Sequence, residues 1–309
     1  MHKILVSDSI AREGVEILRR NAAVVVDDKI TTDALLLAIP DYDALIVRSR
    51  TKVIASIIDA ATRLCVIGRA GVGLDNIDCD AAARRGITVV NSPASAMVSV
   101  AEHTVGLMIA LARFIPQSDV ALRKGIWEKN KYLGIELNGK TLGIIGLGRI
   151  GSMVAVRAES FGMRVVAYDP YIKGERAETF GATLLESLDD LLAMSDFVSI
   201  HTPLMPTTRG LIDADELAKM KRGARLISCA RGGVVDEKAL LAALESGQLA
   251  GAALDVFENE PPGDNPLLKH PRVVVTPHLG AMTEEAQTRA AIDVAEQVVA
   301  ILDDTSRIV

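Results

Sequence analysis

The sequence predicts an α/β protein of two domains, each built on a doubly wound parallel sheet. Its 309 residues are enough for two domains of ordinary size. Hydrophobic residues make up 49% of the chain and aromatic residues only 3%, so aliphatic side chains must fill the interior, as in helices packed on a parallel sheet. Strand-like and helix-like segments also alternate from the first residues onward, which is the rhythm of βαβ units.

Two series of such segments are expected. In the first, strands are predicted at Lys3–Val6, Ala44–Val47, Leu64–Ile67 and Ile87–Val90, with an amphipathic helix at Ala11–Arg20. An apolar helix is predicted at Val98–Phe114, ending before Pro116. In the second series, strands are predicted at Thr141–Ile145, Arg164–Tyr168, Asp196–Ile200, Arg225–Ser228, Gly251–Val256 and Val273–Val275, with helices at Ile150–Phe161 and Thr283–Leu302.

Charge and cysteine content narrow the range of functions. The formal net charge is -6, with both signs spread along the chain, which argues against nucleic acid or an anionic membrane as the main partner. The three cysteines, Cys65, Cys79 and Cys229, are too few and too scattered for a disulfide framework or a zinc site. We therefore expect a cytoplasmic protein with no metal, and we interpret two of the cysteines as small core residues.

The sharpest local signal is the segment Gly146-Leu-Gly148-Arg-Ile-Gly151. It follows an apolar strand and opens a helix, and the next strand ends in Asp169, as a dinucleotide-binding fingerprint requires. The glycines would permit a tight turn, close approach of a pyrophosphate and close packing of helix on strand. Asp169 would accept hydrogen bonds from the adenosine ribose and repel a 2′-phosphate, so the pattern predicts NAD. An ordinary tight turn and an ordinary strand-end carboxylate are the alternatives.

His278, in Val-Thr-Pro-His-Leu-Gly, is the candidate acid–base residue, because histidine exchanges a proton near neutral pH. The other histidines are weaker candidates. His2 is terminal and His270 lies in a polar loop. His103 lies in the apolar helix, where a structural role is expected, and His201 ends a strand and could line the nucleotide site.

Two charged residues complete the candidate chemistry. Arg231, in Ser-Cys-Ala-Arg-Gly-Gly, could hold a carboxylate with two hydrogen bonds, although a surface arginine before a glycine turn is the alternative. Glu260 ends the run Asp255-Val-Phe-Glu-Asn-Glu, and a carboxylate beside His278 would orient its ring. Glu258 or Asp255 could serve equally well, or the run could be a solvated loop. A proton acceptor, a carboxylate anchor and a nicotinamide cofactor are what oxidation of a 2-hydroxy acid needs.

Four motifs follow one another along the chain: Gly-Leu-Gly-Arg-Ile-Gly, Ala-Arg-Gly-Gly, Leu-Asp-Val-Phe-x-x-Glu-Pro and Thr-Pro-His-Leu-Gly. Together they resemble the D-isomer-specific 2-hydroxyacid dehydrogenases. Supporting stretches begin at Ile46, Gly68 and Glu136, so the likeness runs over nearly the whole chain.

The resemblance implies two Rossmann-like domains: a flavodoxin-like, substrate-binding domain of residues 1–96 and 282–309, and an NAD-binding domain of residues 97–281. It implies a catalytic set of Arg231, Glu260 and His278, with His278 as acid/base, Glu260 as its partner and Arg231 as substrate anchor. Arg48 and Arg69 would also bind the substrate's phosphate or carboxylate. The implied NAD contacts are Gly146, Gly148, Arg149, Ile150, Gly151, Asp169, Thr202, Cys229, Ala230, Arg231, Asp255, His278 and Gly280.

The likeness is greatest to family members that oxidise D-3-phosphoglycerate to 3-phosphohydroxypyruvate in L-serine biosynthesis. It also implies a homodimer or higher homo-oligomer, with the helix after Ser99 at the interface. Two positions depart from those members: Ala96 stands where they often carry asparagine, and Met282 where they commonly carry serine. The alternatives are a reductase of glyoxylate, hydroxypyruvate or another 2-oxo acid, and the C-terminal-binding corepressors, which keep these residues but assemble with transcription factors.

Overall fold

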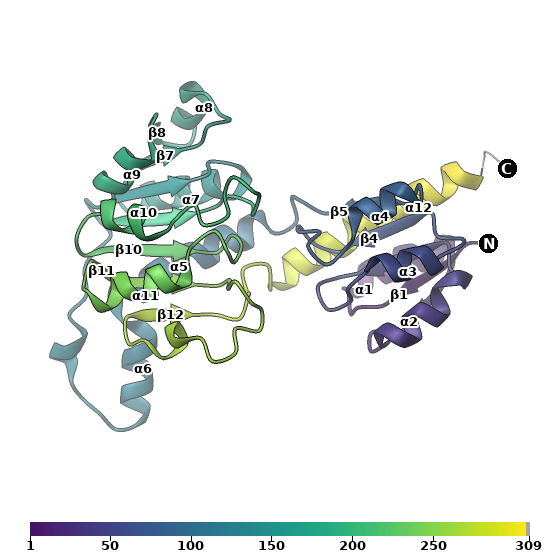
Figure 1. Cartoon of the computed structure of the whole chain (residues 1–309), viewed down its shortest axis with the longest axis horizontal. Coiled ribbons are helices and arrows are strands. Elements are labelled where there is room, and N and C mark those ends of the chain that lie inside the picture. Colours follow the sequence, from purple (N-terminus) through teal and green to yellow (C-terminus); the bar gives the residue numbers. More distant parts are fainter. Residues whose placement is uncertain (307–309) are drawn as a thin grey trace. The chain divides into compact units, whose positions relative to one another are not determined.

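The computed structural model describes residues 1–306 and divides into two compact units (Figure 1). Unit 1 contains residues 1–97 and continues from residue 281, and unit 2 contains residues 98–280. The chain therefore leaves the first unit, builds the second, and returns to the first through its last helix.

Unit 1 contains, within the described residues, a five-stranded parallel sheet in the order β2-β1-β3-β4-β5. This is the order of flavodoxin-like sheets. The strands are β1 (Lys3–Val6), β2 (Ala23–Val26), β3 (Ala44–Val47), β4 (Val66–Arg69) and β5 (Thr88–Asn91). The helices are α1 (Arg12–Asn21), α2 (Thr32–Ala38), α3 (Ala55–Ala60), α4 (Cys79–Arg84) and α12 (Glu284–Ser306), with a 3₁₀ helix at Ile39–Asp41.

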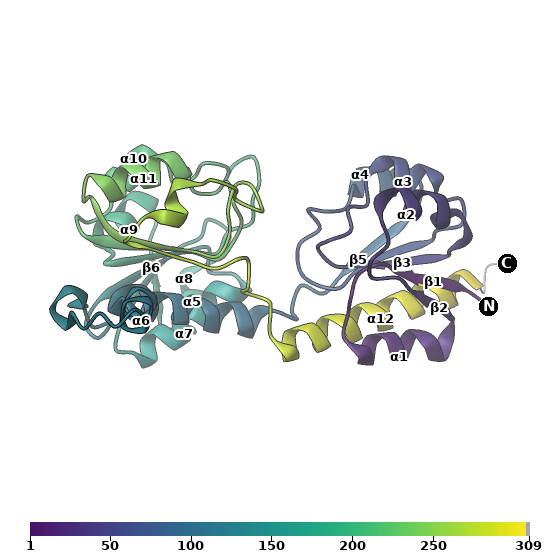
Figure 2. The ribbon, with the colours of Figure 1, turned by 90° about the horizontal axis from the view of Figure 1, so that it is seen from below.

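Helices cover both faces of this sheet, with α2, α3 and α4 on one side and α1 and α12 on the other (Figure 2). Each face has its own apolar core, one around Leu45 and Ile67 and the other around Ile46 and Val294. Strand β3 is therefore buried along its whole length, because alternate side chains enter opposite cores.

Unit 2 contains, again within the described residues, a seven-stranded parallel sheet in the order β12-β11-β10-β9-β6-β7-β8. The strands are β6 (Thr141–Ile145), β7 (Arg164–Tyr168), β8 (Ala182–Leu184), β9 (Phe197–Ile200), β10 (Ala224–Ser228), β11 (Leu249–Leu254) and β12 (Val273–Val275). The helices are α5 (Met97–Arg113), α6 (Ile115–Arg123), α7 (Arg149–Ser160), α8 (Gly174–Glu178), α9 (Leu188–Met194), α10 (Ala214–Lys219) and α11 (Glu237–Glu245), with 3₁₀ helices at Lys129–Tyr132 and Pro266–Lys269.

The strand order of unit 2 determines where a ligand binds. Counted within the unit, the order is that of a dinucleotide-binding sheet extended by one strand, and it reverses between β6 and β9. Ligands of such sheets bind outside the carboxyl ends of the strands at this reversal. Helices α9, α10 and α11 lie on one face of the sheet, and α5 and α7 lie on the other (Figure 2).

Local sequence explains where the helices on the first face begin. Ser187 precedes α9, Asp213 precedes α10 and Asp236 precedes α11, and each side chain accepts a hydrogen bond from a backbone N–H of the first turn. These groups satisfy donors that have no partner inside the helix.

The doubly wound α/β prediction is confirmed by the two parallel sheets, and several details differ from it. Strands β2 and β8 were not expected; β2 is an edge strand with three of its four residues exposed, and β8 is an edge strand of three residues. Helix α6 was not expected either. The chain breaks at Phe114, which adopts a left-handed conformation, and Pro116 then lies in the first turn of a new helix.

Boundary shifts of two residues place functional groups at strand ends. Strand β4 extends to Arg69 instead of Ile67, and β11 ends at Leu254 instead of Val256. The backbone pairing with neighbouring strands fixes both ends. Asp255 therefore follows its strand directly.

Among the described residues, no single helix is long and apolar enough to cross a membrane, and the only helix pair that meets the length and composition test together, α5 with α6, is bent by 62°. Within the same residues, no group of three or more His, Cys, Asp or Glu side chains could hold a metal ion.

Candidate active site

The glycine-rich turn lies at the carboxyl end of β6, at the reversal of strand order. Among the described residues, a Cβ added to Gly148 would meet no atom within 4 Å, whereas one added to Gly151 would lie 2.1 Å from the carbonyl oxygen of Gly146. Gly148 therefore leaves open space in front of α7, and Gly151 lets the helix pack against the turn. Gly146 has a φ of 89°, in the left-handed region that favours glycine. This geometry fits a dinucleotide pyrophosphate at the N-terminus of α7.

The end of β9 lies against the same turn. A Cβ on Gly146 would be 3.0 Å from Cγ2 of Thr202 and 3.1 Å from the carbonyl oxygen of His201. The Thr202 Oγ1 and His201 Nδ1 atoms are buried and make no hydrogen bond within the described residues. Because buried polar atoms almost always have a partner, these two atoms are consistent with a bound group at this position.

His201 is suited to line such a site without transferring protons. Its Nε2 lies 2.8 Å from Oγ of Ser199. Burial lowers the pKa of His201 to about 4, so its ring is neutral at pH 7.

Asp169 follows β7 and holds the glycine-rich turn. One of its oxygens accepts a hydrogen bond from the N–H of Leu147 at 2.9 Å, and the other accepts one from the N–H of Tyr171 at 2.9 Å. Each carboxylate oxygen can accept a second hydrogen bond. Asp169 can therefore bind a ribose hydroxyl and keep both contacts with the backbone.

His278 and Glu260 form the central pair of the candidate site. Nδ1 of His278 lies 2.8 Å from Oε2 of Glu260, although the two residues are 18 positions apart. Their side chains are 45% and 39% exposed, so they can reach a small molecule. The second Glu260 oxygen accepts a hydrogen bond from the N–H of Phe257 at 3.2 Å, which fixes the carboxylate.

The electrostatics of Glu260 favour its ionised form. Burial would raise its pKa, but the hydrogen bond and positive charge of His278, the N–H of Phe257 and the charge of Arg231 together lower the pKa below its ordinary value of 4.5. An ionised Glu260 can only accept a hydrogen bond, so Nδ1 of His278 carries a proton. In the neutral ring, Nε2 is then the unprotonated nitrogen.

Among the described residues, neither of the other two acidic candidates bonds to the ring of His278. Asp255 is 1% exposed, and its carboxylate accepts hydrogen bonds from Thr276 and from the N–H groups of Leu279 and Gly280. Glu258 is exposed, and its N–H donates to Glu237. The structure therefore brings Glu260, and neither alternative, to the ring of His278.

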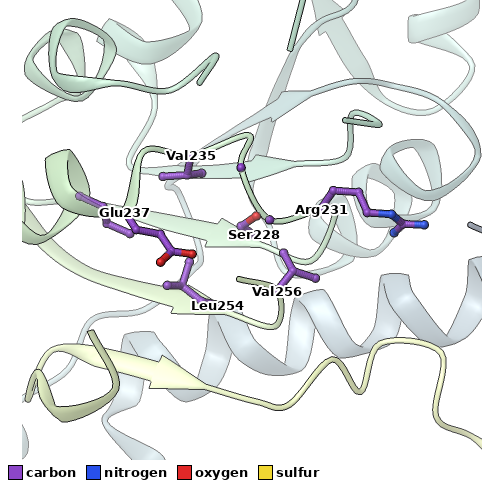
Figure 3. A pocket seen from close by; sticks show the side chains of 9 residues that line it. Ser228, Arg231, Val235, Glu237, Leu254 and Val256 are labelled. Carbon is purple, nitrogen blue, oxygen red and sulfur yellow. The ribbon is translucent and has the colours of Figure 1, made fainter. Parts of the chain in front are cut away.

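Arg231 lies in the turn after β10. One guanidinium nitrogen donates to the carbonyl oxygen of Ala230 at 2.8 Å, and its charge acts on Glu260. Figure 3 shows the Arg231 side chain extending away from a small cavity beneath the turn. That cavity, lined by Ser228, Val235 and Glu237 among others, measures only about 10 Å³, so it has room for about one water molecule and none for a cofactor.

The remaining predicted cofactor contacts of unit 2 lie at the same end of the sheet. Arg149 and Ile150 begin α7, and Cys229 follows β10 directly. Burial raises the pKa of the Cys229 thiol to about 12, so this cysteine is a protonated core group. Gly280 contributes its N–H to Asp255.

Arg48 and Arg69 belong to unit 1. Arg48 follows β3 and Arg69 ends the neighbouring strand β4, so both lie at the carboxyl edge of that sheet. A guanidinium nitrogen of Arg48 lies 3.0 Å from Sδ of Met282, which is 51% exposed. Ala96 is buried. Substrate binding by the two arginines stays a prediction.

Two residues beside the site, Thr276 and Gly232, were not predicted from the sequence as functional residues. Thr276 bonds the carboxylate of Asp255, and Gly232 packs directly on the backbone of Phe257. The only available signal was position: Thr276 precedes Pro277-His278 in the candidate motif, and Gly232 follows Arg231.

Residues 105–280 match the family of NAD-binding domains described as D-isomer specific 2-hydroxyacid dehydrogenase. The chain is 51% identical over 302 residues to D-3-phosphoglycerate dehydrogenase of Methanocaldococcus jannaschii, covering 98% of this chain and 58% of the relative. It is 49% identical to the Homo sapiens protein of the same name, covering 97% of this chain and 56% of the relative. The chain thus spans about half the length of these relatives.

Among solved structures, a glyoxylate reductase from Paecilomyes thermophila aligns with a TM-score of 0.88 and 35% identity, over 97% of this chain and 95% of that one. The match extends over both units. It shows that the same fold occurs in a protein named for a substrate without a phosphate group.

Proposed function

The chain belongs to the D-isomer specific 2-hydroxyacid dehydrogenase family, and on that premise we propose that it oxidises D-3-phosphoglycerate with NAD. The proposal rests mainly on the 2.8 Å contact between Nδ1 of His278 and Oε2 of Glu260. The positive charge of Arg231 also acts on the Glu260 carboxylate. The identity of about half to D-3-phosphoglycerate dehydrogenases of an archaeon and of man supports the choice of substrate.

The roles of the three residues follow from their chemistry. Arg231 binds the substrate carboxylate with its planar guanidinium. His278 takes the proton of the C2 hydroxyl on Nε2 and becomes an imidazolium, which the ionised Glu260 stabilises through Nδ1. When bound, NAD supplies the acceptor for the hydride that leaves C2. The hydroxyl carbon thereby becomes a carbonyl, and the same residues return the proton in the reverse reaction.

The substrate phosphate needs a second positive group. We assign this role to Arg48 and Arg69, which lie side by side at the carboxyl edge of the unit 1 sheet. The overall charge of -6 offers no general attraction for a multiply charged anion, so binding depends on local arginines.

We further infer that the protein is a cytoplasmic homodimer or higher homo-oligomer. All three cysteines are free thiols, which suits a reducing compartment. Helix α6 and the segment after it expose Ile115, Val120, Leu122 and Trp127, and an exposed apolar group of this size is typical of an interface. Light scattering on the purified chain measures the oligomeric state, and a monomer would contradict this inference.

A substrate panel tests the activity. The full chain is assayed with NAD and D-3-phosphoglycerate, and in reverse with NADH and 3-phosphohydroxypyruvate, glyoxylate, hydroxypyruvate or pyruvate. We expect the highest kcat/KM for the phosphorylated pair. Absence of turnover with both phosphorylated compounds would overturn the substrate assignment.

Arginine variants test how the phosphate is bound. Arg48→Gln and Arg69→Gln should each raise KM for the phosphorylated substrate on the order of tenfold or more, with a smaller effect on glyoxylate. Arg12→Gln is the matched control, because Arg12 is an exposed arginine of the same unit that pairs with Glu16 of its own helix. Equal losses for both substrates would contradict a phosphate-binding role.

The second candidate function is reduction of glyoxylate or another unphosphorylated 2-oxo acid. The observation that favours it is the contact of Arg48 with the thioether of Met282, because this apolar residue stands at a position where the phosphoglycerate-oxidising members commonly carry serine. Faster turnover of glyoxylate than of 3-phosphohydroxypyruvate would select this function.

A further inference from the structure

His103 lies in the middle of α5 and contacts Asp255, which follows β11, and Thr276, which begins the turn that presents His278. Its Nε2 is 3.2 Å from Oδ1 of Asp255 and 3.1 Å from Oγ1 of Thr276. The His103 side chain is 22% exposed. These contacts join helix α5 to the ends of strands β11 and β12.

The direction of these hydrogen bonds follows from the donors available. Thr276 donates its hydroxyl proton to Oδ1 of Asp255 at 2.5 Å. The Asp255 carboxylate and the Thr276 oxygen are then both acceptors toward His103, so Nε2 of His103 must carry the shared proton. His103 therefore acts as a donor to both groups at once.

Asp255 in turn holds the backbone that presents His278. Its carboxylate accepts from the N–H of Leu279 at 2.7 Å and from the N–H of Gly280 at 2.8 Å, and its carbonyl oxygen accepts from the N–H of His278 at 2.9 Å. The N–H groups of three consecutive residues thus all donate hydrogen bonds to Asp255. Burial would raise the pKa of Asp255, but hydrogen bonds from His103, Thr276 and the turn lower it.

The turn needs this support because of its backbone conformation. His278 has a φ of 54°, and a residue with a side chain is rarely stable in the left-handed region unless its surroundings impose it. Gly280 also packs tightly here: a Cβ on it would lie 3.1 Å from Asp255 and 3.3 Å from Val100 of α5. Helix α5 is therefore part of the support.

We propose that His103 is a positioning residue, which holds the Asp255 carboxylate and the Thr276 hydroxyl so that the turn of residues 276–280 presents His278 to the substrate. The proposal rests on the proposed function, where His278 is the proton acceptor. His103 itself touches neither substrate nor reacting atoms in this role.

Two substitutions distinguish whether His103 is needed as a hydrogen-bond donor or only for its packing volume. His103→Leu fills a similar volume without a donor, whereas His103→Gln places an amide Nε2 donor at a similar reach. We expect His103→Leu to lower kcat on the order of 10²-fold, with KM and the Kd for NAD changed less than about threefold, and His103→Gln to restore most of kcat. Glu102→Gln, at an exposed position of the same helix, is the matched control.

A readout without substrate or cofactor makes the proposal testable apart from the proposed function. Hydrogen exchange of the Leu279 and Gly280 amides should be faster in His103→Leu by on the order of tenfold, and near wild type in His103→Gln. If the wild type turns over no 2-hydroxy acid but the exchange result holds, the proposed function fails and the positioning role stands.

Three results would overturn the positioning role. The first is a folded His103→Leu protein with kcat within threefold of the wild type, and the second is a folded His103→Gln protein that behaves like His103→Leu. Should His103→Leu not fold, Thr276→Val interrupts the same network from the other side, and unchanged kcat and unchanged exchange in that variant are the third.

Discussion

Replacing Gly232 with alanine should disable the site without removing any functional group. Gly232 follows Arg231, and a Cβ built on it would lie 1.7 Å from the carbonyl oxygen of Phe257 and 2.6 Å from the N–H nitrogen of Glu258. Both obstacles are backbone atoms, so no side-chain rotation relieves the clash. The turn that carries Arg231 and the turn that carries Glu260 must therefore move apart.

The size of the effect follows from the required displacement. A Cβ is essentially never found closer than 3.0 Å to such an atom, so the two turns must separate by roughly 1.3 Å, and a misplacement of about 1 Å costs on the order of 10²-fold in rate. We expect kcat/KM to fall about 10²-fold, which corresponds to about 2.7 kcal/mol of transition-state stabilisation. The Kd for NAD should change less than kcat/KM, because the glycine-rich turn after β6 and Asp169 are untouched, although the implied contacts at Cys229, Ala230 and Arg231 lie in the displaced turn.

The assay compares initial rates of NADH formation, NAD binding and thermal unfolding for the wild type, Gly232→Ala and Gly106→Ala. Gly106 is an exposed glycine of α5, where an added Cβ meets no atom within 4 Å, so alanine there should preserve the rate and raise stability by up to about 1 kcal/mol. A folded Gly232→Ala protein with kcat/KM within threefold of the wild type would refute the reasoning.

Three further predictions concern single side chains. Asp169→Ser should raise the ratio of kcat/KM for NADP to kcat/KM for NAD by on the order of tenfold or more, because it removes a charge that repels a 2′-phosphate. An unchanged ratio in initial-rate assays would mean that Asp169 does not face the ribose. Glu260→Gln should lower kcat on the order of 10²-fold, because an amide can donate to Nδ1 of His278 and favour the wrong tautomer; steady-state kinetics showing less than a threefold loss would contradict the pair. Thr276→Val should lower the free energy of unfolding by about 1–3 kcal/mol at pH 6. This difference should shrink as the pH falls below the ordinary Asp pKa of 3.8. The reason is that the lowered pKa of Asp255 stabilises the fold only while its carboxylate is ionised. Thermal unfolding between pH 3 and pH 6 measures it, and a pH-independent difference would argue against a bond to the ionised carboxylate.

The sequence predicts the strands of this fold best where both faces of a strand are buried. Strands β3 and β6 are continuous apolar runs because helices cover both sides of each sheet. Strand β2 was not predicted, although its sequence Ala-Val-Val-Val is also an apolar, β-branched run. It is an edge strand with Val25 and Val26 exposed, so an apolar run here does not mean burial on both faces. Its pairing with β1 shows that it is a strand.

In the candidate site, too, some residues can be recognised from nearby sequence, whereas others depend on partners that are distant in the sequence. The glycine-rich turn and Asp169 can be recognised because one βαβ unit contains them. The partner of His278 cannot be chosen from the sequence, since three carboxylates lie within six positions of the acidic run. Backbone geometry decides between them: Asp255 follows β11 directly and is buried, whereas Glu260 reaches the ring.

The central claim is that His278 transfers the proton, while most of the implied cofactor contacts are made by other residues of unit 2. The most direct measurement is turnover of the His278→Asn protein alongside its Kd for NAD, both compared with the wild type. We predict that kcat falls on the order of 10³-fold or more and that the Kd for NAD stays within about threefold. Turnover close to that of the wild type would contradict the account, because the proton would then have to leave through another group.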